Sequence, residues 1–332
     1  MNTATKAPVA VIAFVRRDVL DATLRRLSLA EGVLEREVLV YLSAPRNDAE
    51  KRRTDAVREL VEGYKKTSLP NITIVPREKN FGAGLNIRNA ITDALEVCGK
   101  AIIVEDDILI SRTFLRYMDE ALEYYESDPR VWCINGYQNA YMSVPKKYPY
   151  DVYINPMNMA PGWGTWKDRW QAVDFSLADW GEFISSKTNQ ANLDKAGCDI
   201  GKLIELAISG KIDTWDVQCT YHMIKNGMFC IEPRFSLTKN NGMNTVGAVH
   251  CTRRDGFISK QKYFDFMPKL RPVDELTLVS GMLSRRLKYS VRDSRPIYFA
   301  IRCLLRYLRS FLGQDNLEPF PETSIVAYNE RG

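Results

Sequence analysis

Short apolar runs alternate with longer helix-like segments throughout the first 137 residues. The apolar runs have the length of buried strands and lie at residues 9–14, 38–42, 72–75, 101–104 and 131–134. The segments between them that favour helix are residues 18–29, 48–64, 80–96 and 114–125. Strands that alternate with helices predict an α/β fold with a mainly parallel, doubly wound sheet. Ligands of such sheets bind beyond the carboxyl ends of the strands.

The regular alternation fades after residue 137. Residues 138–180 are rich in Tyr, Pro, Met, Asn and Trp, and helical patterns return at residues 200–210 and 216–226. From residue 272 the chain is helical and basic, with a polar tail. We therefore predict a ligand-binding half at residues 1–137, an irregular second half of the same domain at 138–271, and a helical extension at 272–332.

Charge and composition narrow the class of ligand. The chain has 332 residues, 45% of them hydrophobic, and a net charge of +5. Basic and acidic residues are interspersed, which argues against nucleic acid as a partner but suits an anionic ligand or an acidic membrane surface. Seven cysteines without a CxxC pair indicate reduced thiols. With neither a signal-peptide pattern nor an apolar stretch of about 20 residues, the sequence predicts a cytoplasmic protein.

Three consecutive acids, Glu105, Asp106 and Asp107, follow the apolar run at residues 101–104. Repulsion among their carboxylates is unfavourable unless a cation or hydrogen-bond donors share the site. Carboxylate oxygens are hard ligands, so the expected ion is Mg²⁺ or Mn²⁺, bound together with substrate phosphates. The alternative is an acidic turn that caps the following helix, whose N-terminus favours negative charge.

A glycine–tryptophan stretch at residues 161–170 is a second candidate site. Gly162 and Gly164 would let the backbone approach a ligand closely, and the indoles of Trp163 and Trp166 suit the apolar faces of sugar rings. The alternative is a packed aromatic cluster that anchors a long loop, because Trp is usually highly buried.

An acid next to a tryptophan opens the predicted helix at residues 216–226. Asp216 could act as a general base beside Trp215, because an apolar wall raises the pKa of a carboxyl group towards a useful value. Asp is equally a preferred helix N-cap. The chain has two histidines: His222 is expected to be structural, and His250 is a candidate for completing a metal shell or contacting a phosphate.

Taken in order, these segments carry a family resemblance. Residues 11–16, the acidic triplet, residues 161–164 and the Trp215–Asp216 helix resemble the inverting GT-A glycosyltransferases of the N-acetylglucosaminyltransferase I type and their bacterial relatives. The similarity spans about residues 8–255, and its order and spacing are more specific than any single motif. The resemblance implies a Rossmann-like nucleotide-binding core and an acceptor-binding half that supplies the catalytic base.

The resemblance also implies a role for each matching residue. Asp107 would be the direct metal ligand, Asp106 would lie near the ribose and Glu105 near the donor sugar. Arg16, at the end of the first strand, would face the nucleotide. Asp216 would deprotonate the acceptor hydroxyl during a single in-line displacement with inversion at the anomeric carbon.

The donor site implied by the resemblance includes four further residues, which are Ser43, Arg46, Asn80 and Arg88. The chain departs from the family at one of them: Ser43-Ala44 stands where the family has an Asp-Gly pair that helps to read the base. Serine can form a hydrogen bond there without charge, and the implied donor is a UDP-linked sugar. The glycines near Asn80 do not form a dinucleotide-binding GxGxxG fingerprint after the first strand.

Residues 294–313 form a separate candidate feature, a basic amphipathic helix. Arginines lie on one face and Ile and Leu on the other, between Pro296 and Gly313. Such a helix can lie in a membrane interface, which would suit a lipid-linked glycan acceptor in bacterial surface-polysaccharide assembly. It can equally pack its apolar stripe on the core or on another subunit.

Other classes of protein share parts of this pattern. A sugar nucleotidyltransferase needs a glycine-rich basic loop after the first strand, and the sequence FVRRDVLDA lacks one. A non-catalytic carbohydrate-binding protein could keep the aromatic loop, but the triplet together with Asp216 favours an enzyme. A hydrolase of sugar nucleotides would use similar metal ligands and differs by releasing free sugar.

Overall fold

A computed structural model describes residues 6–138, 144–145, 147–197, 200–242 and 262–277. The larger strands are β1 (Val9–Ala13), β2 (Val38–Leu42), β3 (Ile72–Pro76), β4 (Lys100–Glu105), β6 (Val131–Asn135), β7 (Val152–Asn155), β8 (Trp163–Trp166) and β9 (Phe229–Pro233). The short strands are β5 (Ile108–Ile110) and β10 (Thr238–Asn240). The helices are α1 (Arg17–Leu27), α2 (Asp48–Thr67), α3 (Ala83–Cys98), α4 (Phe114–Tyr124), α5 (Lys167–Gln171), α6 (Trp180–Ser185), α7 (Lys187–Ala196), α8 (Ile200–Ile208) and α9 (Asp216–Lys225), with single 3-10 turns at Val33–Glu35 and Val273–Glu275.

Eight strands form one mixed sheet in the order β3-β2-β1-β4-β8-β6-β9-β7. The four strands from the first half of the chain, β1 to β4, pair in parallel. β8 runs antiparallel between β4 and β6, so β6 and its parallel partner β9 point in the same direction as β4. A separate antiparallel pair, β5 with β10, follows the end of β4.

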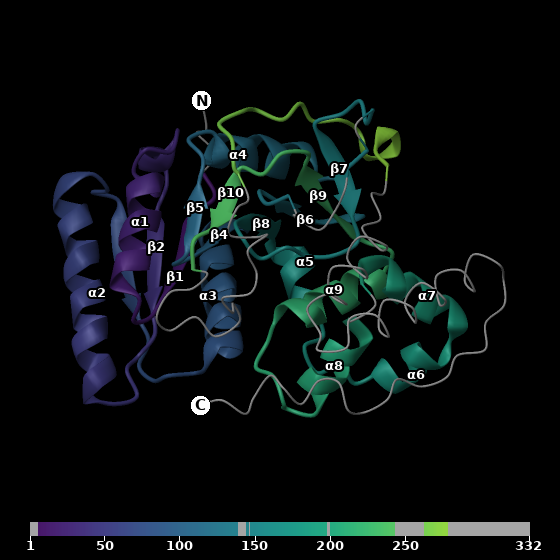
Figure 1. Cartoon of the computed structure of the whole chain (residues 1–332), viewed down its shortest axis with the longest axis horizontal. Coiled ribbons are helices and arrows are strands. Elements are labelled where there is room, and N and C mark those ends of the chain that lie inside the picture. Colours follow the sequence, from purple (N-terminus) through teal and green to yellow (C-terminus); the bar gives the residue numbers. More distant parts are fainter. Residues whose placement is uncertain (1–5, 139–143, 146, 198–199, 243–261, 278–332) are drawn as a thin grey trace.

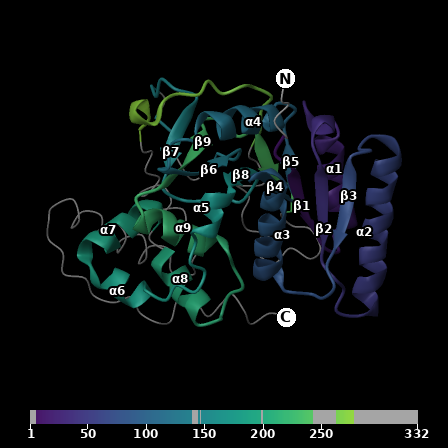
Figure 2. The same ribbon diagram turned by 180° about the vertical axis from the view of Figure 1, so that it is seen from behind.

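Side-chain alternation along the strands divides the core between the two faces of the sheet. In β1, Val9, Val11 and Ala13 join the layer under α1, α2 and α4, whereas Ala10 and Ile12 join the layer under α3, α5 and α9. Figures 1 and 2 show these helices on opposite sides of the sheet. The predicted doubly wound α/β fold is therefore confirmed.

A smaller hydrophobic cluster holds the helices of the second half together. Residues from α6, α7, α8 and α9 pack around Trp180, Phe183 and Tyr221, whose rings meet edge-on or stacked. The outer face of α9 belongs to this cluster, while its inner face, with Cys219 and Met223, packs on the main sheet. One helix thus links the two cores.

The sequence predicted little regular structure over residues 138–180, and this expectation is wrong for β7, β8 and α5. All four residues of β8 are buried, as are all four of β7. A strand buried on both faces has no alternation of polar and apolar residues, so periodicity could not identify it.

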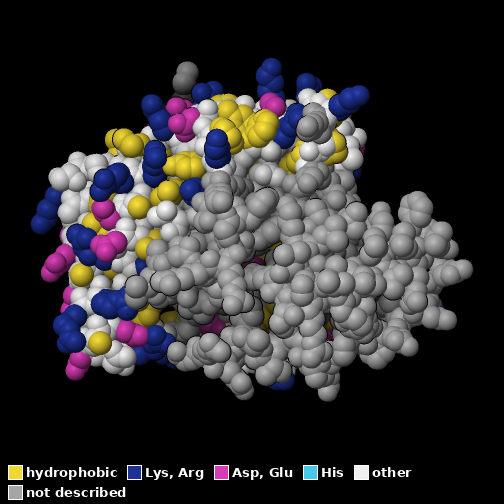
Figure 3. All heavy atoms as spheres, viewed as in Figure 1, with side chains coloured by type: hydrophobic (Ala, Val, Ile, Leu, Met, Phe, Trp, Pro, Cys, Tyr) yellow, Lys and Arg dark blue, Asp and Glu magenta, His cyan; other side chains and the backbone are white. Residues whose placement is uncertain are grey.

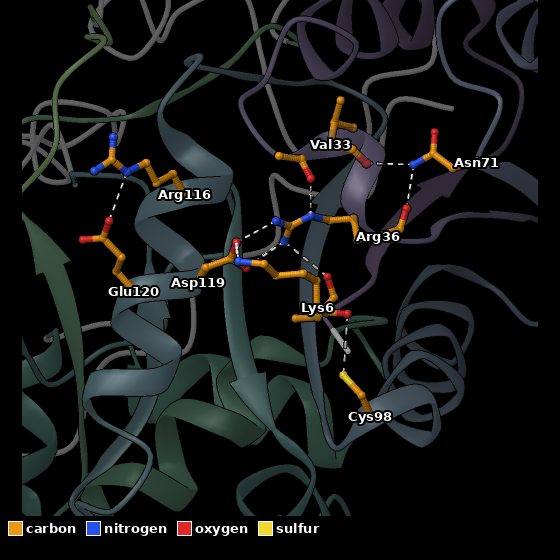
Figure 4. A network of polar contacts seen from close by, with 10 residues as sticks. Lys6, Val33, Arg36, Asn71, Cys98, Arg116, Asp119 and Glu120 are labelled. Atoms are coloured by element: carbon orange, nitrogen blue, oxygen red, sulfur yellow. Dashed lines mark hydrogen bonds and ion pairs between the residues drawn. The ribbon is translucent and has the colours of Figure 1, made fainter. Parts of the chain in front are cut away.

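A buried arginine joins α4 to the 3-10 turn Val33–Glu35 (Figure 4). The side chain of Arg36 is fully buried and donates to both carboxylate oxygens of Asp119, at 2.8 and 2.6 Å, and to the Gly32 carbonyl at 3.0 Å. Lys6 adds a second cation 3.0 Å from Asp119. A buried guanidinium requires this carboxylate, because an uncompensated buried charge is strongly destabilising.

We predict that Asp119→Asn lowers the free energy of unfolding by about 2 kcal/mol, because asparagine keeps only one of the two oxygens that accept from the buried guanidinium and removes its counter-charge. Urea denaturation would measure the change. Glu120→Gln is the matched control, because Glu120 pairs with Arg116 on the exposed side of the same helix and should change stability by less than about 0.5 kcal/mol. Equal effects of the two substitutions would refute this role of Asp119.

Among the described helices, none combines the length and the apolar character needed to cross a membrane. The predicted helix at residues 294–313 lies outside the described residues.

Candidate functional site

The acidic triplet lies at the carboxyl edge of the parallel strands, as predicted. The β1–β4 register pairs Ile12 with Glu105, and the Asp106 amide donates to the Ile12 carbonyl at 3.0 Å. The buried hydroxyl of Thr23 on α1 donates to the Asp106 carbonyl at 2.7 Å. These bonds fix the turn after β4 and place its carboxylates beside the residues that follow β1.

Arg16 follows β1 and pairs with two of the three acids. Its guanidinium forms an ion pair with Asp107 Oδ2 at 3.0 Å and donates to Asp106 from two nitrogens, with Nε at 3.2 Å from Oδ2. Burial opposes the charged form, but Asp106 and Asp107 outweigh it and raise the pKa of Arg16 above its ordinary value. Arg16 therefore stays a cation and neutralises one negative charge of the triplet.

The negative charge of the triplet is not fully compensated. Burial raises the pKa of Glu105 to about 8, with further increases from Asp107 and Asp106. Burial also raises the pKa of Asp106 to about 7, although Arg16 opposes this shift. Shifts of this kind are expected where carboxylates outnumber the cations that face them. The excess negative charge of these carboxylates would therefore stabilise a further cation at this site.

The carboxylate oxygens of the triplet fit a hard divalent cation whose other ligands come mainly from the phosphate groups of the substrate. Asp107 is buried, its backbone carbonyl accepts from the Asn241 amide at 2.7 Å, and a side chain at Gly242 would collide with its carboxylate. Nowhere in the described ranges do three or more His, Cys, Asp or Glu side chains converge as a metal cage. One or two carboxylates plus phosphate oxygens is nevertheless the arrangement that Mg²⁺ adopts with nucleotide substrates.

Asp216 is the first residue of α9 and lies close enough to Glu105 to contribute to the raised pKa of Glu105. Its Oδ1 atom accepts from the Thr214 hydroxyl and from the Val217 amide, the latter at 3.0 Å. Among the described residues Oδ2 has no hydrogen-bond partner. The N-cap position belongs to Trp215, which makes no side-chain cap, so the alternative role of Asp216 as a conventional N-cap is not what the structure shows.

Asp213 joins the loop before α9 to the N-terminus of α3. Its carboxylate accepts from the amides of Ala83 at 2.8 Å and Gly84 at 3.1 Å, although it lies far from them in the sequence. A Cβ on Gly84 would lie 2.5 Å from Asp213 Oδ1, so glycine permits this close approach. The contact couples the position of the Asp216 loop to the Asn80–Gly84 loop.

We predict that Asp213→Ala lowers the free energy of unfolding by about 1 kcal/mol, because two amides at a helix N-terminus lose their acceptor. Thermal or urea denaturation would measure the loss. Asp213→Asn retains an acceptor oxygen and should lose less than half as much. A larger loss for Asn than for Ala would contradict the capping role.

The tryptophans of residues 161–170 lie in the core, and their predicted role as open sugar-binding faces needs correction. Trp163 is fully buried and stacks between Trp132 at 5.6 Å and Trp215 at 5.3 Å. The buried Trp166 donates its indole N–H to the Leu122 carbonyl at 3.1 Å. With both faces of Trp163 covered by other indoles, the packed aromatic cluster is the correct interpretation.

The two glycines of this stretch also serve packing. Gly162 has a φ of +77°, and a Cβ there would lie 2.8 Å from the Thr238 side chain. A Cβ on Gly164 would lie 3.2 Å from the Ala101 carbonyl of the neighbouring strand β4. The glycines allow β8 to enter the sheet, and Trp215, which stacks on Trp163, anchors the start of α9 to it.

The other residues predicted for the donor site are Ser43, Arg46, Asn80 and Arg88, and they differ in how close they lie to the carboxyl end of β1. Ser43 follows β2 beside β1, with its amide 3.1 Å from the Ala13 carbonyl, and Asn80 donates to the Ala44 carbonyl at 2.8 Å. These two residues therefore lie next to the edge that carries Arg16. Arg46 pairs with Glu50 on the exposed first turn of α2, and its guanidinium lies 5.6 Å from the ring centroid of Phe14, which follows β1, so Arg46 also borders this edge.

Arg88 on α3 stacks over Phe175 at 3.9 Å, and burial lowers the pKa of its guanidinium. Among the described residues it forms no ion pair. His222 lies within α9 and faces Asn226, and burial lowers its pKa, in agreement with a structural role. His250 lies outside the described residues.

Comparison with known protein families identifies one that matches this chain. The family model described as the GNT-I family matches residues 1–195, which is more than half of the chain. No curated protein sequence matches the chain.

Solved structures with a similar arrangement share little sequence with it. A mannosyltransferase from Pyrobaculum calidifontis, in complex with GDP-Man and Mn²⁺, is 15% identical with a TM-score of 0.36, and the match covers 57% of this chain and 52% of that one. TarS from S. aureus is 13% identical with a TM-score of 0.42, with coverages of 72% and 61%. The chain thus spans between half and two thirds of the length of these structures. On the match over residues 1–195, the chain belongs to the GNT-I family, which confirms the resemblance found in its motifs.

Proposed function

We propose that this protein is a metal-dependent, inverting glycosyltransferase that moves a sugar from a nucleoside-diphosphate sugar to a hydroxyl group of a glycan. Membership of the GNT-I family supports the transfer reaction. The observation that carries the metal-dependent part is the triplet Glu105–Asp107, in which Asp106 and Asp107 are buried and whose negative charge Arg16 only partly neutralises. Asp107 is the residue proposed to hold Mn²⁺ or Mg²⁺.

Asp216 is proposed as the general base. Its Oδ1 is held by Thr214 and Val217, so Oδ2 is the oxygen that would accept the proton of the acceptor hydroxyl. The acceptor oxygen then forms its bond to the anomeric carbon as the bond from that carbon to the diphosphate oxygen breaks, and the nucleoside diphosphate leaves. A divalent cation at Asp107 would supply charge stabilisation for the departing diphosphate.

The remaining residues would orient the donor. Arg16 is proposed to face the nucleotide, Asp106 the ribose and Glu105 the donor sugar, as the family resemblance implies. Ser43 and Asn80, which lie beside the end of β1, would contact the base, and a UDP-linked sugar is the proposed donor. Arg88 is also proposed to contact the donor, because its half-buried guanidinium forms no ion pair with the described residues.

The proposed acceptor is a glycan or lipid-linked glycan of bacterial surface-polysaccharide assembly, reached at the cytoplasmic side of a membrane. This part rests on the amphipathic pattern of residues 294–313 and on the net charge of +5.

A product assay tests the proposal against the hydrolase alternative. The protein would be incubated with radiolabelled UDP-sugars and lipid-linked glycan acceptors, with Mn²⁺ or with EDTA. Label in the glycan fraction that requires both metal and acceptor supports transfer. Metal-dependent release of free sugar at the same rate with and without acceptors would identify a hydrolase instead.

A further inference from the structure

Two exposed phenylalanines, Phe235 and Phe264, lie side by side. In the sequence they are far from the acidic triplet Glu105–Asp107. Phe235, between β9 and β10, is 48% exposed, and Phe264 is 45% exposed. Their ring centroids lie 5.9 Å apart, and the Phe264 amide donates to the Ser236 carbonyl at 2.9 Å. A hydrogen bond therefore fixes the backbone that presents both rings, and adjacent exposed aromatic rings commonly mark an interaction surface.

Basic side chains lie near the aromatic residues of these segments. The guanidinium of Arg234 lies 5.5 Å from the Phe235 ring centroid, and Arg26 of α1 lies 5.7 Å from that of Tyr263. Lys262 is exposed, and neither it nor Arg26 forms an ion pair within the described part of the chain. We call these six residues, Arg26, Arg234, Phe235, Lys262, Tyr263 and Phe264, the aromatic–basic face.

The charge of this surface is predominantly positive. The aromatic–basic face contains three basic side chains, Arg26, Arg234 and Lys262, and the acid next to it in the sequence is Asp265. The Oδ1 atom of Asp265 accepts a hydrogen bond from the backbone amide of Arg112 at 2.6 Å. Figure 3 shows hydrophobic side chains grouped along the upper edge of the molecule among Lys and Arg and a few acidic side chains, in the region where Figure 1 draws residues 262–277.

We propose that the aromatic–basic face docks on a membrane surface that contains anionic lipids. Basic side chains near such a surface are attracted to its negative potential, and exposed aromatic rings gain from entering the headgroup region. A duplex nucleic acid or an acidic protein would use the cations but would not require two adjacent phenylalanines half open to water. Charge complementarity together with the two rings therefore favours a lipid surface.

The inference stands apart from the proposed reaction, because vesicle binding needs neither donor nor acceptor. It also differs from the predicted interfacial helix at residues 294–313, since every residue of the aromatic–basic face lies within the described part of the chain. The full chain is used in the test, so that any contribution of residues 294–313 is the same in all variants.

Flotation with phosphatidylglycerol-containing and pure phosphatidylcholine vesicles tests the proposal. The wild-type chain should bind the anionic vesicles and not the neutral ones. Arg26→Gln with Lys262→Gln should weaken binding roughly 30-fold, because each cation near the surface contributes about a fivefold factor. Phe235→Ser with Phe264→Ser should weaken it by about tenfold or more.

The matched control is Ile208→Ser with Tyr124→Ser, two side chains that are 49% and 47% exposed but lie on α8 and α4, outside the aromatic–basic face. This pair should leave vesicle binding within about twofold of the wild type. Thermal melting of every variant would verify that it is folded. An unchanged affinity of the folded Phe235/Phe264 variant, or an equal loss in the control pair, would overturn the proposal.

A second measurement avoids loss-of-function variants. In Phe264→Trp, the added indole should be quenched by vesicles that carry brominated acyl chains, beyond the quenching of the wild type. Absence of added quenching in a chain that floats with the vesicles would overturn the proposal. So would binding to a soluble polyanion with no binding to anionic vesicles.

Discussion

Replacing Asp216 by Asn is expected to lower kcat for sugar transfer about 1000-fold, because a positioned general base contributes between about 10² and 10⁴ in rate. The amide has nearly the same shape and can still accept from Thr214 and Val217 through its oxygen. It cannot take a proton from the acceptor hydroxyl. Donor binding should therefore remain within about twofold of the wild type, since the substitution removes only an interaction of the transition state.

Steady-state transfer kinetics together with calorimetric binding of the donor would separate these two effects. Asp55→Asn is the matched control, because Asp55 is an exposed acid that pairs with Lys51 on α2, away from the triplet. It should leave kcat unchanged. Near-normal transfer by Asp216→Asn would show that another group removes the proton.

Replacing Asp107 by Ala is expected to remove metal-dependent nucleotide binding, weakening the affinity for the nucleoside diphosphate in Mn²⁺ by about 100-fold or more. Even groups that contact a metal indirectly change metal affinity by about 10- to 100-fold when mutated. The residual affinity of the variant should equal that of the wild type in EDTA, because the same interaction is missing in both.

Because Asp107 is buried, Asp107→Ala needs a control variant that keeps the shape of the side chain. Asp107 is buried, pairs with Arg16 and lies against Gly242, so the alanine variant could also disturb the loop. Asp107→Asn keeps the shape and the backbone bond to Asn241 but has a weaker metal ligand, and it should show the same loss in Mn²⁺. Retention of metal-dependent binding by both variants would exclude Asp107 as the ligand.

The first half of the fold could be predicted because its strands and helices have distinct periodicities. The apolar run at residues 38–42 coincides with β2, and the predicted helix at residues 114–125 differs from α4 by one residue. The buried strands β7 and β8 could not be found in this way, because all of their residues are buried and no alternation marks them.

Part of the candidate site could also be predicted, because it follows directly from strand ends. Arg16 and the triplet lie where β1 and β4 end, and parallel neighbours bring these ends together. The contacts of Asp213 with Ala83 and of Gly242 with Asp107 join segments far apart in the sequence, and no local pattern indicates them. The tryptophans were ambiguous for a different reason: residue type alone does not distinguish an open indole face from a stacked one, and the core position of Trp163 decides it.

The most direct test of the central claim is calorimetric titration of the wild-type chain with nucleoside diphosphates and their sugar conjugates, in Mn²⁺, in Mg²⁺ and in EDTA. The proposed function predicts that one nucleotide, UDP, binds in the presence of a divalent cation and that its binding is lost in EDTA. Absence of binding by every nucleotide under every metal condition would contradict a donor site at the triplet and favour a carbohydrate-binding protein without transfer activity.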